Sequence, residues 1–524
     1  MTTLQTPGRA LSQLDEGERY RCFDELQLSM PSVWESMRLD LDGESVVVVP
    51  SVSLTRTTVG SGTVTQAMEE RALFLLLLLR QPRLRMIYVT SQPVAESIVE
   101  YYLGLLPGVI PSHARARLTL VSVNDATPDS LSSKLLARPR LLRHIRSLIP
   151  NAARSHLIPY NTTELERDVA LSLGIPMYGA DPRLADLGSK TGCRRLFEEL
   201  AVNCPVGAED LHTVDDIVAG VQSMRERRPS LSQAIVKLNE GVSGAGNAMV
   251  ELRDLPAPGS PDEAAAIRGC VLALQPESEK LSVDTYLTAF EKHGGIVEER
   301  ITGIALTSPS VQMRGLPDGT VELLSTHDQL LGGASGQKYL GCIFPADSRY
   351  AAAIAQPAMV IGRHLASLGV LGRFAVDFVV VQDDGGAWTP YAIELNLRKG
   401  GTTHPFLTLQ FLTDGTYDGE RGVFLTPGGT AKYLVATDHL EDDRLKALTA
   451  ADLFDTIVRH GLHFDQSRRT GVVFHMISCL TECGRVGMTA VGDSPEDTWR
   501  IYKEAQAVLL AEADSALEQG PITT

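Results

Sequence analysis

The sequence is predicted to fold as an α/β domain followed by α+β domains. Over residues 1–185, short apolar segments alternate with helical segments, which is typical of an open α/β sheet. Later in the chain, residues 234–238 and 248–252 are two strands joined by a Gly-rich loop instead of a helix, as in a hairpin. The length of 524 residues exceeds what one ordinary core supports, so we expect about two to four domains.

The first domain opens with a strand at Val46–Val49, whose consecutive valines suit burial on both faces of a parallel sheet. The apolar run Ala72–Leu79 is far shorter than a membrane span and is bracketed by Arg71 and Arg80, so we expect a buried helix. No Gly-rich phosphate fingerprint follows the first strand, which argues against a dinucleotide-binding domain. The other elements expected here are strands at 85–90, 117–122 and 156–160 and a helix near 94–103.

The first domain is expected to end with a helix that has Asn161 or Thr162 as its N-cap and stops near Gly174. A new helix at Thr191–Leu200 opens the second region, and the Pro- and Gly-containing stretch Thr426–Thr430 marks the next boundary. Beyond it, a strand at 471–477 and a last helix at 494–517 indicate an α+β tail. The predicted domains are residues 1–185, 186–425 and 426–524, with the middle one divided near residue 300.

Composition narrows the class of protein. The formal charge of −16 argues against a nucleic-acid-binding surface. Residues 1–20 lack the apolar core of a signal peptide. Seven Cys, an odd number without a ligand-spaced quartet, suit a reducing compartment, and the closest pair, Cys479 and Cys483, is interpreted as structural. We therefore expect a cytoplasmic protein with no membrane or nucleic-acid partner.

Three oxygen-bearing side chains on two neighbouring apolar strands are the most informative feature. Glu394 and Asn396 point to the same face of their strand because side chains alternate along it. If the strand that carries Asp377 pairs with this one, Asp377 adds a third oxygen ligand to that face. Two carboxylates and an amide suit Mg²⁺, which binds few protein groups and leaves room for phosphate oxygens.

Two lysines and a Gly-rich loop precede this motif. Lys190 opens a helix, and Lys237 lies among apolar strand residues, where its ammonium must reach solvent or meet an anion. The Gly241–Gly246 loop joins two strands, so it is neither a Walker loop nor a Rossmann turn. A plain hairpin explains the loop by itself. Because the loop lies between a strand lysine and a metal motif, phosphate binding is the favoured interpretation. Glycines let backbone N–H groups approach phosphate closely.

The segment Gly295–Ile301 is an apolar strand interrupted by charge. Two interpretations stay open on this segment alone. It is an exposed edge strand, or it is a hinge whose backbone pairs with a purine edge and whose Glu299 is available to sugar hydroxyls.

The order of these motifs along the chain, from Lys190 to Glu394-x-Asn396, resembles the ATP-grasp family over about Leu157–Pro405. The resemblance implies a pre-ATP-grasp α/β domain, two α+β subdomains (about 190–300 and 300–425) that hold Mg-ATP between them, and here a small α+β C-terminal domain. It implies that Asp377, Glu394 and Asn396 bind Mg²⁺, which Mn²⁺ can replace. The implied ATP contacts are Lys190, Lys237, Gly241, Ser243, Gly244, Gly246, Glu298, Glu299 and Ile301.

Within that family, the layout is most similar to the pheganomycin-type peptide ligases, and the segments Ser325–Gln329 and Gly332–Gln337 fit this likeness. The resemblance implies a homodimer whose substrates are a small-molecule acid and an amine, each an amino acid or a peptide. One departure concerns the ribose. Many members place an acid shortly after the hinge, but none occurs here between Arg300 and Asp318.

Cations beside the metal motif are the candidates for contact with the reacting groups. Arg398 and Lys399 follow Asn396 closely and are predicted to be catalytic, since an Arg makes bidentate hydrogen bonds to a phosphoryl or carboxylate group. Arg314 is a candidate clamp for the substrate carboxylate, with a surface strand Arg as the equal alternative. His475, inside an apolar strand of the tail, is by default a satisfied core residue. The predicted substrate-binding residues are Arg314, Arg373, Gln337 and His404.

The implied activity is ATP-dependent ligation of a carboxylate to an amine through an acyl phosphate, with release of ADP and phosphate. Positioning and charge neutralisation by metal, Lys and Arg are expected to do most of the catalysis. Two alternatives remain: an ATP-grasp kinase acting on a small-molecule hydroxyl, and a nucleotide-binding interaction module without catalysis.

Overall fold

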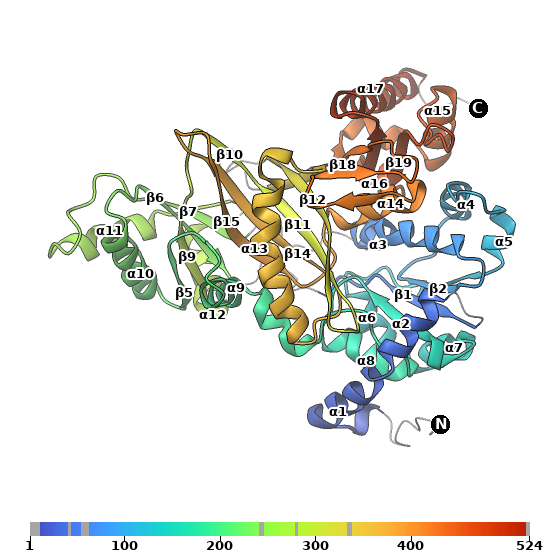
Figure 1. The fold of residues 1–524 in the computed structure, drawn as a ribbon, viewed down its shortest axis with the longest axis horizontal. Helices are drawn as coiled ribbons and strands as arrows, with labels where there is room; N and C mark the ends of the chain where they lie inside the picture. Colours follow the sequence, from blue (N-terminus) through green and yellow to red (C-terminus); the bar gives the residue numbers. More distant parts are fainter. Residues whose placement is uncertain are drawn as a thin grey trace.

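The computed structural model describes residues 11–39, 43–53, 62–239, 246–277, 281–332 and 338–519. Within these residues the strands form sheets of four, five and nine strands and a small two-stranded ribbon. The three large sheets occupy different regions of the molecule (Figure 1). The five-stranded sheet lies to the left in that view, the nine-stranded sheet runs from the centre to the upper right, and the four-stranded sheet lies to the right.

The four-stranded sheet is parallel throughout, in the order β3-β2-β1-β4. Every residue of β1 is buried, as the run of valines predicted. Thr163 is the N-cap of α8, in a capping box with Glu166, so the predicted cap at Asn161 or Thr162 is wrong. Asn161 instead accepts a hydrogen bond from the backbone N–H of Ser53. The elements of this part are η1 Leu11–Gln13, α1 Glu16–Gln27, α2 Met30–Arg38, β1 Ser45–Val49, α3 Gly62–Glu70, η3 Arg71–Arg80, β2 Arg85–Thr90, α4 Glu96–Gly104, α5 Pro111–Arg115, β3 Leu118–Ser122, α6 Leu131–Leu136, α7 Pro139–Leu148, η4 Ala152–Arg154, β4 Ser155–Pro159 and α8 Glu164–Leu173.

The leucine run is the 3-10 helix η3, not an α-helix. It is buried along almost its whole length, as expected. Because the run is apolar on every side, its sequence carries no amphipathic period that could specify the number of residues per turn. Packing against α3, α4 and α14 surrounds it instead.

The five-stranded sheet is antiparallel, with the order β5-β9-β6-β7-β8. Strand β9 pairs on one side with β5 and on the other with β6, so the interpretation of this segment as an exposed edge strand is wrong. The elements of this part are η5 Pro182–Gly188, α9 Lys190–Glu199, β5 Gly207–Leu211, α10 Val214–Arg227, β6 Gln233–Leu238, β7 Asn247–Glu251, α11 Glu263–Leu272, β8 Gln275–Pro276, α12 Val283–His293 and β9 Gly295–Glu299.

The nine-stranded sheet carries both the predicted metal residues and the tail. Its order is β10-β14-β11-β12-β13-β18-β20-β19, with β15 also paired to β14. Strands β18, β20 and β19 extend the sheet through β13, so the predicted boundary near residue 426 falls inside a continuous sheet. The elements are β10 Ala305–Thr307, β11 Pro309–Gly315, β12 Val321–Gly332, β13 Lys338–Phe344, α13 Ser348–Ser367, β14 Gly372–Gln382, β15 Trp388–Asn396, α14 Thr403–Thr413, β16 Thr416–Asp418, β17 Val423–Leu425, β18 Tyr433–Glu441, η6 Asp443–Ala447, α15 Ala450–Arg459, β19 Gly471–His475, α16 Cys479–Cys483, β20 Arg485–Gly492 and α17 Pro495–Gln519.

The first part of the chain and the tail share one hydrophobic core. Leu73 and Tyr102 from the first part belong to the same buried cluster as Leu434 and Phe474 from the tail. The hydroxyl of Tyr102 donates to the carbonyl of Phe474 at 3.1 Å. Sequence segments far apart therefore form one body, to which the metal strands also belong.

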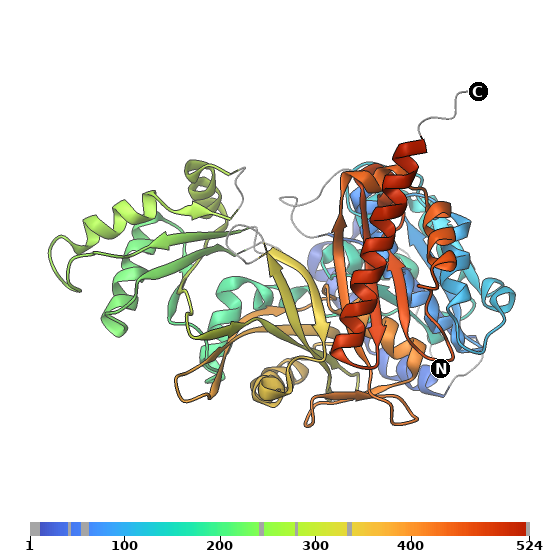
Figure 2. The ribbon, with the colours of Figure 1, turned by 90° about the horizontal axis from the view of Figure 1, so that it is seen from above.

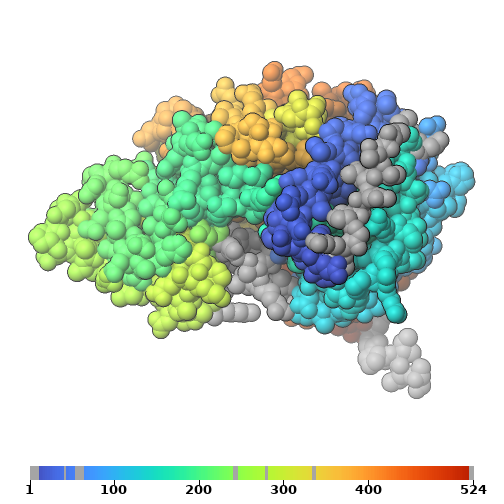
Figure 3. Space-filling view, turned by 90° about the horizontal axis from the view of Figure 1, so that it is seen from below, coloured from blue at the N-terminus to red at the C-terminus, as the bar shows by residue number. Residues whose placement is uncertain are grey.

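The 190–300 lobe projects from this body. After β9, residues 300–304 lead from the five-stranded sheet to β10 in the nine-stranded sheet. Figure 2 shows the lobe extending to one side when the molecule is seen from above. In Figure 3, the space-filling view from below, the lobe again stands beside the blue and teal first part.

A chain ending at Leu425 is expected to lose the cooperative fold, because β13 would lose its partner β18 and the shared core would lose its tail half. Soluble yield and the thermal unfolding midpoint measure this, with a chain ending at Gln519 as the control. A soluble 1–425 chain that melts cooperatively within about 5 °C of the control would contradict the shared core.

Candidate active site

Asp377 and Glu394 lie directly opposite each other on β14 and β15. Asn396 stands one alternation further along β15, and its Nδ2 donates to Asp377 Oδ2 at 3.0 Å. A β-bulge between Asp377 and Phe378 interrupts the register at this point. The two segments therefore pair, and the three side chains meet on one face of the sheet.

Lys190 reaches this face from the first turn of α9. Its Nζ lies 2.7 Å from Glu394 Oε2. Two contacts fix the start of the helix: Ser189 Oγ accepts from the Gly192 N–H, and Asn239 Oδ1 accepts from the Thr191 N–H and hydroxyl. A Cβ on Gly192 would stand 1.9 Å from the carbonyl oxygen of Asp186. The glycine after Lys190-Thr191 therefore lets α9 approach η5 closely.

Lys237 lies on β6 and Glu298 on the adjacent β9. Lys237 Nζ is 2.5 Å from Glu298 Oε1, and Arg194 approaches the same carboxylate at 3.8 Å. The buried lysine on an apolar strand has thus met an anion, as the sequence required. The negative charge of Glu298 also favours the charged form of Lys190, and the positive charge of Lys237 favours the ionised form of Glu394. The two lysines and the two glutamates form one charge cluster between the lobe and the nine-stranded sheet.

The two carboxylates of the metal motif differ in their electrostatics. Burial, and then the charge of Glu394, raise the pKa of Asp377 above its ordinary value. Burial is the largest influence on Glu394 and raises its pKa, but the charges of Lys190, Arg398 and Lys237 together bring the pKa below its ordinary value. Two facing carboxylates favour a cation between them.

The residues fit a magnesium ion. Asp377 and Glu394 offer hard carboxylate oxygens, and Asn396 keeps its Oδ1 after its Nδ2 has bonded to Asp377. Three protein oxygens leave further positions for phosphate oxygens.

The remaining predicted ATP contacts divide into three groups. Glu299 is engaged in structure: its carboxylate accepts from the Val206 N–H at 2.9 Å and pairs with Arg228, so it is not available to a ribose. The carbonyl of Gly246 accepts from Leu238 N–H and the Tyr286 hydroxyl, and Ile301 lies in the connection after β9. Gly241, Ser243 and Gly244 lie outside the described residues, as does Gln337.

Two of the predicted substrate residues are held by other groups. Arg314 forms an ion pair with Glu322 and stacks over the ring of Trp34, so its guanidinium is not a free clamp. His404 is buried against Asp438 and His475 in the tail, which takes it away from a substrate role. His404 follows Arg398 and Lys399 closely in sequence, which suggested a substrate contact, but α14 directs its side chain into the core.

Arg373 differs from Arg314, which stands opposite it on β11. Its Nη1 is buried without a hydrogen-bond partner. Burial, and then the charge of Arg314, lower the pKa of Arg373 to about 10. A buried guanidinium nitrogen without a partner favours the binding of an anion there.

Arg398 and Lys399 lie in the loop between β15 and α14. Arg398 Nη1 donates to the Lys399 carbonyl at 3.1 Å, and Lys399 Nζ donates to the Pro159 carbonyl at 2.5 Å. Burial, and then the charge of Arg373, lower the pKa of Lys399 to about 7. A small cavity of about 20 Å³ borders Lys399, His404, Arg71 and Tyr160.

Sequence reasoning missed two positioning residues. Gln312 on β11 hydrogen-bonds the hydroxyls of Thr402 and Thr403 and so anchors the loop that follows the metal motif. Asn239 fixes the start of α9, as described above. A signal existed for the first, because Gln312 is a polar residue between the apolar Val311 and Met313 on a buried strand. For Asn239 the only signal was its place between the strand lysine and the Gly loop.

Known protein families and solved structures resemble parts of this chain. Residues 278–420 match the family model of the IQCH-like ATP-grasp domain, and residues 452–503 match that of the PGM1 C-terminal domain. Solved structures share the fold. These include a biotin carboxylase from Campylobacter jejuni (TM-score 0.51, 11% identity, 91% of this chain and 97% of that one) and the biotin carboxylase domain of Hydrogenobacter thermophilus 2-oxoglutarate carboxylase (TM-score 0.52, 11% identity, 88% and 89%). The matched family region overlaps the stretch whose motif order resembled the ATP-grasp family, and the shared fold agrees with the fold that this resemblance implied.

Two further proteins are similar to this chain over most of its length. The chain is 28% identical over 456 residues to the L-propargylglycine–L-glutamate ligase of Streptantibioticus cattleyicolor. The aligned region covers 85% of this chain and 90% of that ligase. It is 24% identical over 444 residues to IQ motif-containing protein H of Danio rerio, of which it spans 42%. The first of these supports the predicted relationship to the pheganomycin-type peptide ligases. Among the described residues, no helix combines the length and apolar character needed to cross a bilayer.

The lowered pKa of Lys399 predicts a pH effect on stability. An unfolded lysine has a pKa of about 10.4, so between about pH 7 and pH 10 the unfolded chain binds more protons than the folded one, and the free energy of unfolding rises with pH. In Lys399→Met this contribution is expected to disappear. Urea unfolding midpoints across that range test it, with the exposed Lys503→Met as control. An unchanged pH slope in Lys399→Met would mean that this amine is charged in the fold.

Proposed function

We propose that the chain is an ATP-dependent carboxylate–amine ligase that joins amino acids or peptides by an amide bond through an acyl phosphate. The observation that carries the proposal is the charge cluster at the junction of the two sheets. There an oxygen-bearing metal face, Asp377, Glu394 and Asn396, stands against Lys190. The name of the Streptantibioticus cattleyicolor relative, a ligase of two amino acids, supports the reaction class.

In this proposal the phosphates of ATP take the place that Glu394 and Glu298 now hold as partners of Lys190 and Lys237. Asp377, Glu394 and Asn396 would hold Mg²⁺, which supplies charge neutralisation to the phosphoryl group in flight. The lysines neutralise the remaining phosphate charge. Catalysis then comes from positioning and fixed charge, with no side-chain nucleophile needed.

The substrate acid is assigned to Arg373. Of the paired arginines on β11 and β14, Arg314 already has the Glu322 carboxylate, whereas Arg373 has a buried nitrogen without a partner. A substrate carboxylate would satisfy that guanidinium by a charge-assisted hydrogen bond. Arg398, two residues beyond Asn396, is proposed to contact the transferred phosphoryl group.

The proposed ligase reaction passes the γ-phosphoryl group of ATP to the substrate carboxylate and gives an acyl phosphate and ADP. The amine then attacks the acyl carbon and expels phosphate. Water must be kept from the acyl phosphate in the interval, which requires closure of the lobe over the site. Adenine is assigned to the hinge after β9, where Ile301 lies.

Mass spectrometry of products from ATP, Mg²⁺ and mixed amino acids tests the reaction class. A ligase gives ADP, phosphate and a dipeptide whose mass equals the two amino acids less water, and ADP release depends on both acid and amine. A phosphorylated product that forms without an amine would identify a kinase instead. No ADP from a broad panel of acids and amines would identify a binding module.

Replacing Glu394 by Gln is expected to lower ADP release at least about 100-fold, because one carboxylate ligand is lost while the side-chain volume is kept. This loss corresponds to about 2.7 kcal/mol of barrier. Steady-state ADP release at saturating ATP measures it, with Glu322→Gln, the partner of Arg314, as the matched control. Turnover of Glu394→Gln within about tenfold of wild type would remove Glu394 from the metal site.

A further inference from the structure

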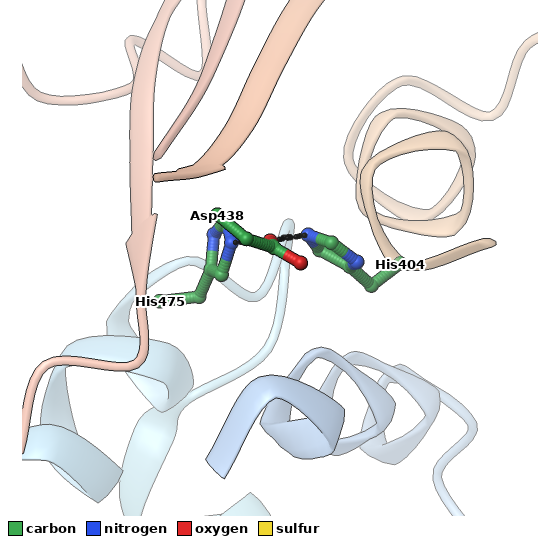
Figure 4. Close-up of side chains that lie close together, drawn as sticks. All are labelled: His404, Asp438 and His475. Atoms are coloured by element: carbon green, nitrogen blue, oxygen red, sulfur yellow. Dashed lines mark hydrogen bonds and ion pairs between the residues drawn. The ribbon is translucent and has the colours of Figure 1, made fainter. Parts of the chain in front are cut away.

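Three buried ligating side chains converge away from the charge cluster. His404 comes from the first turn of α14, Asp438 from β18 and His475 from the end of β19. Each is no more than 5% exposed. Figure 4 shows the two imidazole rings directed at the same carboxylate. The proposed ligase reaction uses none of the three.

The three ligating atoms form a small triangle. His475 Nε2 lies 2.7 Å from Asp438 Oδ1, His404 Nε2 lies 3.4 Å from the same oxygen, and the two Nε2 atoms are 3.1 Å apart. For Zn²⁺ with ligand distances of about 2.0–2.1 Å and tetrahedral angles, adjacent ligand atoms stand about 3.3 Å apart. The triangle is close to that size, and a small outward adjustment would centre an ion on it.

Hydrogen bonds alone do not satisfy the two histidine nitrogens and the Asp438 oxygen of this triangle well. A hydrogen on His475 Nε2 can point at Asp438 or at His404, but not well at both. His404 Nδ1 is buried with no partner, so a change of tautomer does not relieve the ring. With a hydrogen on Nδ1, the His404 ring presents the lone pair of Nε2 to the other two ligating atoms. One cation would accept all three lone pairs.

The surroundings orient the carboxylate for one-oxygen ligation. Asp438 Oδ2 is bound by Arg71 Nη1 at 2.6 Å, and Arg71 Nη2 donates to the Tyr160 hydroxyl at 2.7 Å. This leaves Oδ1 for the two histidines. Partner groups that fix a metal ligand in this way are typical of metal centres.

We propose that His404, Asp438 and His475 bind one Zn²⁺ ion that ties α14 to the tail strands. Two imidazoles and one carboxylate favour a borderline transition metal over Mg²⁺. A small cavity beside His404, Arg71 and Tyr160 has room for about one water. The role is structural: the ion joins elements from three regions of the chain.

Metal content of the full-length protein tests the site. Wild-type protein stripped with a chelator, refilled with Zn²⁺ and freed of excess is expected to hold one equivalent by mass spectrometry of the metal. The double variant His404→Ala/His475→Ala should lose that equivalent. His439→Ala, on the same strand β18 but paired with Glu441, should retain it. Asp377→Asn/Glu394→Gln should also retain it, which separates this ion from one held by the magnesium ligands.

Wild-type measurements keep the test decisive if the double variant does not fold. X-ray absorption at the zinc edge should show nitrogen and oxygen ligands without sulfur, which excludes binding by the free cysteines. Zn²⁺ should also raise the thermal unfolding midpoint of the stripped protein. Sulfur in the zinc shell, or stripped wild type that takes up less than about one half equivalent with an unchanged midpoint, would overturn the proposal.

Discussion

The ion pair between Lys190 and Glu394 is the constraint on which the active site depends. It joins the first turn of α9 to the end of β15, and thereby the lobe to the strands of the metal face. Both partners are held in place by their own surroundings. Asn239 fixes the start of α9, and the sulfur of Cys193 accepts the N–H of Leu395, next to Glu394. The helix and the strand therefore reach the site in a fixed relation before any ligand is present.

This pair also explains why charges of both signs are gathered without nucleotide. A buried lysine or carboxylate without a partner would be costly. Lys190 with Glu394 and Lys237 with Glu298 satisfy one another within the protein. A triphosphate with its metal ion can exchange with these pairs, since it brings anions for the lysines and a cation for the carboxylates. The resting contacts thus mirror the charges of the expected ligand.

Much of the fold followed from local pattern. The strand at Val46–Val49 and the end of a helix near Gly174 were predicted from local sequence pattern, and the strand pairing on which the role of Asp377 was conditional is present. The features that local pattern left open or predicted wrongly are those that tertiary packing decides. The form of the leucine run, the central place of β9 and the continuity of the sheet past residue 426 depend on partners distant in sequence. The same holds for Arg314 and Glu299, whose partners Glu322 and Arg228 could not be read from spacing.

The continuous nine-stranded sheet has a consequence for synthesis of the chain. The metal-bearing strands β14 and β15 leave the ribosome long before β20, which ends at Gly492. Until β18 has emerged, β13 presents an open edge, and until the tail is complete the buried leucines of η3 lack part of the core that they share with it. Nascent chains with an exposed strand edge and apolar surface are prone to aggregate. The strands of the active site are therefore synthesised before the tail that completes their sheet and the shared core. Chaperone binding is most useful at this stage.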